Sequence, residues 1–495
     1  MILTILLLLP LLTAAVLAIS NAKASRTVAM AGSGLQLLAS LLLLQNYLTE
    51  RALGNTAAFL FESSSAWFPA LNINFHIGVD GISVAMILLT SFVVFAGVLV
   101  SWKVEKMTKE FFLLLIILSA GAYGFFISLD LFLLFFFLEV AVIPKYLLIG
   151  IWGSGRKEYS ANKLALMLMG GSALVLVGML GMYFNSGNSF DIVHLSTFHI
   201  PFYIQKIFFP FLFIGFGVFT AIFPFHTWVP DGHSSAPTAA SMFLAGISMK
   251  LGGYGCLRVA TYLMPEAAHY YSGYIVLVAA IAIIYGAFAT MMQTDLKYIN
   301  AYSSVSHCGF VLLGIGMLTK TAITGAVLQM VSHGLMTALF FAAIGMLYER
   351  THTRAVAELG GLMKMMPFIS TVFFIAGLCS LGLPGFSGFV AEMTVFIGSW
   401  QRSGTFYHIA TILACMSIVV TAVYILRATG QSVMGPVKNA AFSNLTDAHW
   451  NEKLAAVVLI AGIVAIGIMP FWLNDLVSPG ADAIYNQLSR IALLK

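Results

Sequence analysis

Fourteen long apolar runs follow one another along the 495-residue chain, and no other feature constrains its fold as strongly. Most runs hold about 17–25 residues, the length that an α-helix needs to cross a bilayer. A helix satisfies its backbone hydrogen bonds within its own segment, so it is stable in lipid. We therefore predict an all-α polytopic membrane protein with about 14 transmembrane helices. The runs cover residues 1–20, 27–46, 80–102, 111–128, 130–152, 161–183, 205–223, 236–259, 272–292, 298–318, 322–347, 367–397, 408–430 and 454–473.

The composition agrees with a membrane protein. Hydrophobic residues make up 60% of the chain and charged residues 9%, whereas soluble domains carry about 25% charged residues. The net charge of +5 is spread over the loops, which predicts contact with a lipid bilayer and no nucleic-acid partner. The four cysteines form no C-x-x-C motif, so neither a disulfide framework nor an iron–sulfur cluster is indicated.

The distribution of Lys and Arg among the loops predicts the orientation. With the N-terminus outside, the inner loops hold fifteen of these residues and the outer loops hold seven. The two others, Lys145 and Lys250, lie within apolar runs. Because cytoplasmic loops carry the excess of positive charge, both termini are expected on the outer, periplasmic side of the membrane.

Two of the fourteen runs are interrupted. The seventh breaks around Phe223–Pro224, and the twelfth breaks in the glycine-rich stretch 381–388. The breaks lie five runs apart, so helices 4–8 and 9–13 would form two halves that are inverted relative to each other. Paired broken helices in inverted halves indicate an ion site in transporters, although ordinary membrane helices also tolerate proline kinks.

This pattern predicts four regions in the chain. They are the first three helices (1–110), a first repeat with helices 4–8 (111–260), an inverted second repeat with helices 9–13 (270–430), and a loop followed by the last helix (431–495).

Among the charged residues inside apolar runs three stand out, because a charge in such a position costs roughly 2.5–3.5 kcal/mol. Lys250 lies deep within the run 236–259, Glu139 is surrounded by apolar residues, and Lys145 directly follows Pro144. Charges in such positions indicate ion or proton pathways. The alternatives are a lysine whose stem reaches the membrane surface and a glutamic acid that stays neutral and hydrogen-bonded.

Two histidines and one acid complete the candidates for proton transfer. His307 and His333 lie on successive apolar runs, and Glu392 follows the break in the twelfth run. Histidine changes its charge near neutral pH, so two of them on adjacent helices could relay protons. Each histidine could instead be a packing residue, and Glu392 could lie at the membrane surface. Asp80 and Asp130 begin runs, where acids stabilise helix N-termini, and we interpret both as structural.

The sequence lacks the motifs that mark nucleotide binding and metal binding. The chain has no P-loop for ATP and no G-x-G-x-x-G motif after a strand for a dinucleotide. The spacing of its His, Asp and Glu residues forms no closed metal shell. We therefore expect no catalytic nucleophile, no cofactor and no metal on this chain itself.

Three segments resemble one protein family closely. They read HTWVPDGHSSAPTAASMFLAGISMKLGGYG (226–255), QTDLKYINAYSSVSHCGFVLLG (293–314) and LPGFSGFVAEMTVF (383–396). These segments are similar to the proton-translocating, antiporter-like subunits of respiratory complex I, the NADH:quinone oxidoreductase. The sequence MKLGGYG at 249–255 favours the M-type branch over the L-type and N-type branches. The resemblance covers essentially the whole chain.

The resemblance implies two inverted five-helix repeats, with a half-channel in each and a polar axis along the membrane midplane. By position, Glu139 matches the glutamate of the fifth helix, Lys250 the lysine of the eighth and Glu392 the acid of the twelfth. His307 and His333 match the bridging histidines.

The resemblance also implies proton translocation coupled to quinone reduction, in the inner membrane of a bacterial cell. L-type and N-type antiporter-like subunits would be the neighbours of the chain, and FMN, the iron–sulfur clusters and the quinone would lie on partner subunits. Three alternatives remain: a subunit of a multi-subunit cation/proton antiporter, a subunit of a membrane-bound hydrogenase complex, and a scaffold subunit that does not pump.

One position departs from the family pattern. The family has a lysine in the seventh helix, five residues before the proline of its P-x-H-x-W motif, and this chain has Phe219 there. Glu139 therefore lacks the cation that the resemblance would give it. We hypothesise that Lys145, an extra cation on the fifth run, replaces this lysine. Six residues of ideal helix separate it from Glu139 by about 9 Å, so a bend at Pro144 would be needed.

Overall fold

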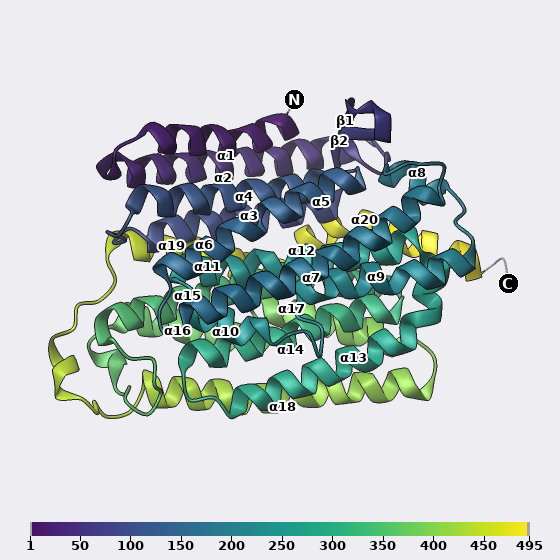
Figure 1. The fold of residues 1–495 in the computed structure, drawn as a ribbon. Helices are drawn as coiled ribbons and strands as arrows, with labels where there is room; N and C mark the ends of the chain where they lie inside the picture. The colour runs from purple at the N-terminus through teal and green to yellow at the C-terminus, as the bar shows by residue number, and fades with distance from the viewer. Residues whose placement is uncertain (1, 493–495) are drawn as a thin grey trace.

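The computed structural model describes residues 2–492 as a bundle of long helices that lie side by side (Figure 1). A β-hairpin, β1 (Leu60–Phe68) and β2 (Ile73–Val79), lies with the short helix α8 (Ile192–Thr197) at one end of the bundle. We call this the outer end, because the charge distribution places its loops outside. The long segment that precedes α19 lies at the opposite, inner end.

Within residues 2–492, eleven helices are long and apolar enough to cross a membrane. They are α1 (Ile2–Ile19), α2 (Ala22–Ala52), α3 (Gly81–Val100), α4 (Thr108–Ile127), α5 (Leu131–Val140) with α6 (Val142–Trp152) as one span, α7 (Lys157–Phe184), α9 (Phe202–Thr220), α13 (Pro265–Met291), α15 (Lys320–Thr351), α18 (Thr405–Ser432) and α19 (Trp450–Ile468). The prediction of a helical, multi-pass membrane protein is therefore confirmed.

The three remaining predicted runs are also helical, but they are interrupted or more polar. The first contains α11 (Thr238–Phe243) and α12 (Met249–Gly255) with the π-helical turns Leu244–Ser248 and Cys256–Thr261, the second is α14 (Leu296–Met317), and the third contains α16 (Pro367–Ser380) and α17 (Ser387–Trp400). The other elements are α10 (Trp228–Ser235), α20 (Phe471–Ala492) and the 3-10 turns Pro69–Leu71, Leu362–Lys364 and Ala440–Asn444.

Both predicted interruptions are present. Helix α9 ends at Thr220, Ala221 takes a left-handed conformation with φ of 66°, and the next helix is α10. In the twelfth run, residues 381–386 separate α16 from α17. Gly382 has φ of 73° there, and a side chain at this position would lie 2.6 Å from the Glu392 carboxylate. Glycine is therefore needed for both the backbone conformation and the space.

The fifth run contains a further break that bears on its charged residues. Helix α5 ends at Val140 and α6 begins at Val142. Pro144 follows closely, and a proline ring both removes a hydrogen bond and clashes with the carbonyl four residues earlier, which here is residue 140. The spacing of an ideal helix therefore does not apply between Glu139 and Lys145.

Helix α15 forms the centre of the bundle, since its most apolar 18-residue window is completely buried. Beside it, α13 and α14 approach closely through small residues: Gly286 faces the backbone of Ser306, and Gly309 faces Ile283. A larger side chain at either glycine would force the two backbones apart. This close packing fixes the position of α14, which carries His307.

Three features differ from the predictions. The segment 47–79, which the all-α prediction leaves without strands, contains the β-hairpin, whose strand β1 is mostly exposed and therefore shows no apolar alternation. Helix α20 follows the run predicted to be the last. Lys297 and Arg258, counted as an inner and an outer loop residue, are both buried in helical segments. Because one is removed from each side, the orientation inferred from the charges stays the same.

A buried histidine connects the hairpin to the bundle. The imidazole of His76 lies 2.8 Å from a carboxylate oxygen of Glu62 and 2.7 Å from one of Asp191, which caps α8. The hydrogen bond to Asp191 and the two negative charges raise the pKa of His76, although burial opposes this. An imidazole between two carboxylates donates from both nitrogens only when it is protonated. A charged His76 therefore holds β1, β2 and the start of α8 together.

Candidate functional site

Lys250 lies between two π-helical turns at the centre of the bundle. The turns Leu244–Ser248 and Cys256–Thr261 flank α12, and such turns are frequent at functional sites. The Lys250 ammonium donates one hydrogen bond to the carbonyl of Ala245 and a second, of 2.9 Å, to Nδ1 of His333. Only 1% of the lysine is exposed. Lys250 is therefore a buried cation in direct contact with a titratable ring, and its stem does not reach the membrane surface.

The two predicted histidines are stacked on each other. The ring centroids of His307 on α14 and His333 on α15 are 5.2 Å apart, with an angle of 27° between the planes. Among residues 2–492, Nε2 of His333 has no hydrogen-bond partner. The thiol of Cys308 lies 3.9 Å from Nδ1 of the same ring. The two rings are close enough that protonation of one disfavours protonation of the other.

His307 contacts three polar groups with its two nitrogens. Its Nδ1 lies 3.4 Å from Oε1 of Glu392 and 3.3 Å from the amide nitrogen of Gln329. Its Nε2 lies 3.1 Å from the hydroxyl of Ser380. An unprotonated Nδ1 accepts from Gln329, and a protonated Nδ1 donates to Glu392. The site therefore holds a hydrogen-bond partner for each protonation state of His307.

These contacts join four predicted residues into one chain: Lys250, His333, His307 and Glu392. None of the four exposes more than 4% of its surface. They come from four helices, α12, α15, α14 and α17. Each residue can gain or lose a proton, so the arrangement can pass protons through an apolar bundle.

The two charged residues of the fifth run, Glu139 and Lys145, are not members of this row of four contacting residues. Lys145 is 1% exposed, and within residues 2–492 its ammonium has no hydrogen-bond partner. It lies over the ring of Phe219 on α9, 5.8 Å from the centroid. One carboxylate oxygen of Glu139 is also buried without a partner, whereas the residue as a whole is half-buried. Lys145 therefore faces the position at which the family pattern has its lysine.

The structure adds polar groups that we did not single out from the sequence. Both ring nitrogens of His233 are buried without a partner among the described residues, and the ring stacks on Phe341 at 5.0 Å. The Lys297 ammonium donates to the carbonyl of Ala236 over 2.6 Å. Their signal in the sequence was weak, because His233 lies in a polar turn and Lys297 lies two residues after the acid Asp295.

The two acids that we interpreted as structural cap helices. The side chain of Asp130 accepts from the backbone of Phe132 and Leu133 at the start of α5. Asp80 accepts from the backbone of Ser83 at the start of α3 and also pairs with the buried Arg258. This ion pair connects α3 to the π-helical turn that follows α12.

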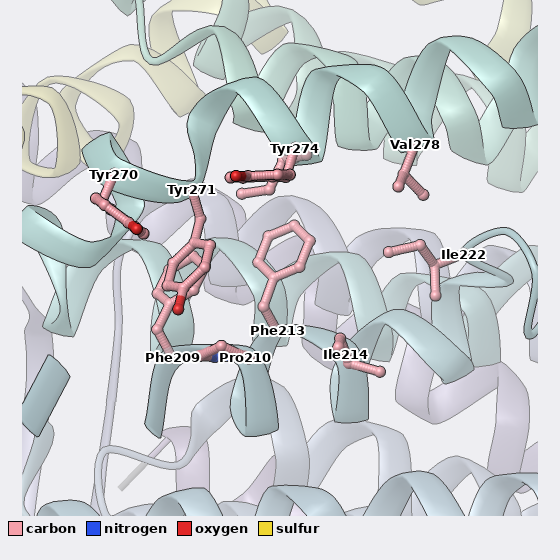
Figure 2. Close-up of a pocket in the computed structure, with 10 residues that line it drawn as sticks. Phe209, Pro210, Phe213, Ile214, Ile222, Tyr270, Tyr271, Tyr274 and Val278 are labelled. Atoms are coloured by element: carbon pink, nitrogen blue, oxygen red, sulfur yellow. The ribbon is translucent and has the colours of Figure 1, made fainter. Parts of the chain in front are cut away.

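An apolar groove lies apart from the polar chain. It has a volume of about 300 Å³ and lies between α9 and α13. Figure 2 shows its lining: Phe209, Phe213 and Ile214 from α9 face Tyr270, Tyr271, Tyr274 and Val278 from α13. The aliphatic and aromatic lining offers no carboxylate, histidine or lysine to bind or pass a proton.

No group of three or more His, Cys, Asp or Glu side chains in residues 2–492 is arranged to hold a metal ion.

Comparisons with known proteins agree with this geometry. A family described as NADH:quinone oxidoreductase/Mrp antiporter, TM, matches residues 128–417. The chain is 36% identical to NAD(P)H-quinone oxidoreductase chain 4 2 of Microcystis aeruginosa, over 94% of this chain and 90% of that one. It is 37% identical to NADH-quinone oxidoreductase subunit M of Rickettsia conorii, over 83% of each chain.

A solved structure shows the same fold. A chain of respiratory complex I from Thermus thermophilus with bound NADH superposes with a TM-score of 0.90 at 26% identity, covering 99% of this chain and 100% of that one. Among the alternatives that the sequence left open, these relatives favour the quinone oxidoreductase over the antiporter and hydrogenase complexes. The chain therefore belongs to the antiporter-like family of NADH:quinone oxidoreductase membrane subunits, as a homologue of subunit M.

Proposed function

We propose that this membrane subunit of complex I moves protons through Lys250, His333, His307 and Glu392. The observation that carries the proposal is their continuous contact, from the 2.9 Å hydrogen bond between Lys250 and His333 to the 3.4 Å approach of His307 and Glu392. Buried groups of this kind are expensive in a membrane and mark ion pathways.

Electrostatic repulsion between neighbours would drive the proton along the chain. Two unit charges at the 2.9 Å between Lys250 and His333 repel each other by about 6 kcal/mol at an effective dielectric constant of 20. Lys250 and His333 therefore do not both hold a positive charge. A proton that loads one of them favours release from the other toward His307 and then Glu392.

Lys145 would take the role of the family's seventh-helix lysine. This role is supported by the position of the Lys145 ammonium. It lies 5.8 Å from the centroid of the Phe219 ring, and Phe219 occupies the position of the family's lysine. Glu139 would be the partner of Lys145. A change in the pairing of these two charges would couple this subunit to its neighbouring subunit, which would contact the exposed part of Glu139.

The arrangement in the membrane follows from the same proposal. All fourteen helical runs would cross the bilayer, and residues 111–260 and 270–430 would form the two inverted repeats. The partners of the chain are other subunits of complex I, and we propose the L-type and N-type subunits as its direct neighbours. FMN, the iron–sulfur clusters and the quinone would bind to partner subunits.

The charge distribution supports the proposed orientation, with both termini in the periplasm of a bacterial cell and the protein in its inner membrane. The terminal residues Met1 and Lys495 lie outside the described residues. Lipid would cover the exposed apolar side chains of the outer helices, such as Leu166 on α7 and Val419 on α18.

Substitutions of Glu392 test the proposal in the assembled complex, reconstituted into proteoliposomes. Glu392→Asp keeps a titratable group and should retain most proton pumping, whereas Glu392→Ala should lose most of it. NADH oxidation and acidification of the vesicle lumen give the number of protons moved per NADH. Equal losses in both variants would assign a packing role to Glu392 and would contradict the proposal.

A further inference from the structure

Helices α13 and α18 lie side by side at the edge of the bundle, and an apolar groove runs between them (Figure 1). The groove has a volume of about 260 Å³, and its lining includes Ile284 and Phe288 of α13 and Leu413, Met416 and Val420 of α18. Half of Phe288 and 62% of Met416 are exposed. Exposed apolar surface of this kind marks a binding site for a partner or for lipid. We call it the α13–α18 groove.

A second cavity lies at the inner end of the same two helices, and its lining is more polar. It has a volume of about 250 Å³ and is lined by Gln293, Thr294, Arg427 and Gln431, among others. The guanidinium, the two amides and the hydroxyl of these side chains all carry hydrogen-bond donors. Such a set of donors suits the oxygens of a phosphate group. We call this cavity the inner pocket.

The inner pocket continues the α13–α18 groove toward the inner membrane surface. On α13, Met291 of the pocket follows Phe288 of the groove by about one helical turn. On α18, Arg427 lies about 10 Å beyond Val420 and about 21 Å beyond Leu413 along the helix axis. One half of the hydrocarbon core of a bilayer is about 15 Å thick. The groove therefore lies at the depth of the inner leaflet's acyl chains, and the pocket lies at the depth of its headgroups.

Arg427 is held in place while some of its donors stay available. Its Nη2 donates to the carbonyl of Met291 at the end of α13 and, over 3.3 Å, to the carbonyl of Gln293. Within residues 2–492, all hydrogen bonds of Arg427 use this nitrogen, and no carboxylate pairs with the guanidinium. The atoms Nε and Nη1 can therefore donate to two oxygens of one phosphate, the geometry that distinguishes arginine from lysine.

The charges around the inner pocket favour an anion. The ammonium of Lys438 donates over 3.2 Å to the carbonyl of Ala357, which is a lining residue. Of the acids nearby in the sequence, Asp295 is paired with Arg354 at 3.1 Å, and Glu358 is exposed and hydrogen-bonded. The pocket therefore has an excess of positive charge.

We propose that the α13–α18 groove and the inner pocket together bind one anionic glycerophospholipid of the inner leaflet. Its phosphate binds Arg427, and Gln293, Thr294 and Gln431 donate to the other oxygens of the headgroup. One acyl chain lies in the groove as far as Leu413. A free phosphate would leave the groove unfilled, and a zwitterionic lipid would leave the positive charge of the pocket without a net counter-charge. The site is separate from the proton chain proposed above.

Photolabelling of the intact complex in proteoliposomes tests this site. The probe is phosphatidylglycerol with a diazirine in one acyl chain, present at a low mole fraction in phosphatidylcholine. The reference is phosphatidylcholine that carries the same diazirine. We expect phosphatidylglycerol to label peptides 281–292 and 413–426 several-fold more than the reference, as measured by mass spectrometry. Equal labelling by the two lipids would indicate ordinary boundary lipid, and absent labelling would indicate that another subunit covers the groove; either result would overturn the proposal.

The contact with the headgroup is tested with Arg427→Gln, which removes the charge. Labelling by phosphatidylglycerol should fall roughly tenfold, because one hydrogen bond between charged groups supplies a factor of about this size. Lys23→Gln is the matched control, since Lys23 is an exposed cation at the same end of the bundle, and it should label as the wild type does. Undiminished labelling in Arg427→Gln would contradict binding of the phosphate in the inner pocket.

The acyl chain is tested with Val420→Trp, which fills the groove and leaves the inner pocket intact. Val419→Trp is its control, because Val419 is 68% exposed and does not line the groove. We expect labelling to be lost in Val420→Trp and kept in Val419→Trp, and equal labelling in both would contradict the placement of the chain. Proton pumping is recorded in parallel in every variant. Failure of the lipid site and failure of the proton chain therefore appear in different measurements.

Discussion

Replacing Lys145 by methionine should reduce proton pumping and at the same time stabilise the protein. The side chain is 1% exposed, and its ammonium has no hydrogen-bond partner within residues 2–492. Taking such a charge out of water costs several kcal/mol. The ring of Phe219, 5.8 Å from the ammonium, returns up to about 2 kcal/mol through a cation–π contact. The buried Lys145 ammonium therefore destabilises the fold by a net few kcal/mol. A purely structural role would not explain a lysine at this position.

Methionine fills a similar volume without the charge, so Lys145→Met should raise the melting temperature of the assembled complex. It should also reduce the protons pumped per NADH, because Glu139 would lose its nearby cation. Lys157→Met is a matched control: Lys157 begins the neighbouring helix α7, lies near the membrane surface and donates to the carbonyl of Ile151. This control should change neither quantity.

The position of the charge is tested by moving it to the seventh helix. The double variant Lys145→Met with Phe219→Lys should recover part of the pumping. The new lysine would stand at position 219 of α9, which the Lys145 ammonium now contacts. Reconstituted complex, thermal melting and vesicle acidification are the assays. Normal pumping in Lys145→Met would refute the functional role, and a double variant no better than the single one would refute the replacement.

The other predictions concern the neighbouring acid, the orientation and the outer hairpin. Glu139→Gln should reduce pumping in a fully assembled complex, and wild-type proton yields in such a variant would exclude Glu139 from the pathway. Cysteines at the exposed positions Asn55 and Gln401 should be labelled from the periplasm, and those at Lys23 and Lys364 from the cytoplasm; the opposite pattern would reverse the orientation. Since the pKa of His76 is raised, its stabilisation of the hairpin is complete below the ordinary histidine pKa and is lost as pH rises through the raised value. Hydrogen exchange of residues 60–79, corrected for intrinsic rates, should therefore quicken at alkaline pH, and a His76→Gln variant should lack this dependence.

Much of the fold follows from the sequence, because the physical constraint in a membrane is strong and local. Long apolar runs must be helices in lipid, and the glycine-rich stretch 381–388 predicts the break that separates α16 from α17. The cost of a charge in such a run also makes Lys250 and Glu139 conspicuous without any structure. These inferences depend only on the chemistry of the chain segment itself.

The arrangement of the site depends on contacts between distant segments. Lys250 and His333 are 83 residues apart and touch only because α12 and α15 pack together. Lys145 faces Phe219 because α5 and α6 are separate helices, a break that an ideal helix would not predict.

The burial of Lys297 and Arg258 shows the same limit of the sequence. Counting charges assigns both residues to loops, but burial is decided by the neighbouring helices that cover them. The sequence alone thus identifies the charged groups whose burial in a membrane costs so much free energy that a function is expected of them. The tertiary structure decides which of them touch, because a proton moves between two groups only when packing brings them within hydrogen-bond distance or leaves room for water between them.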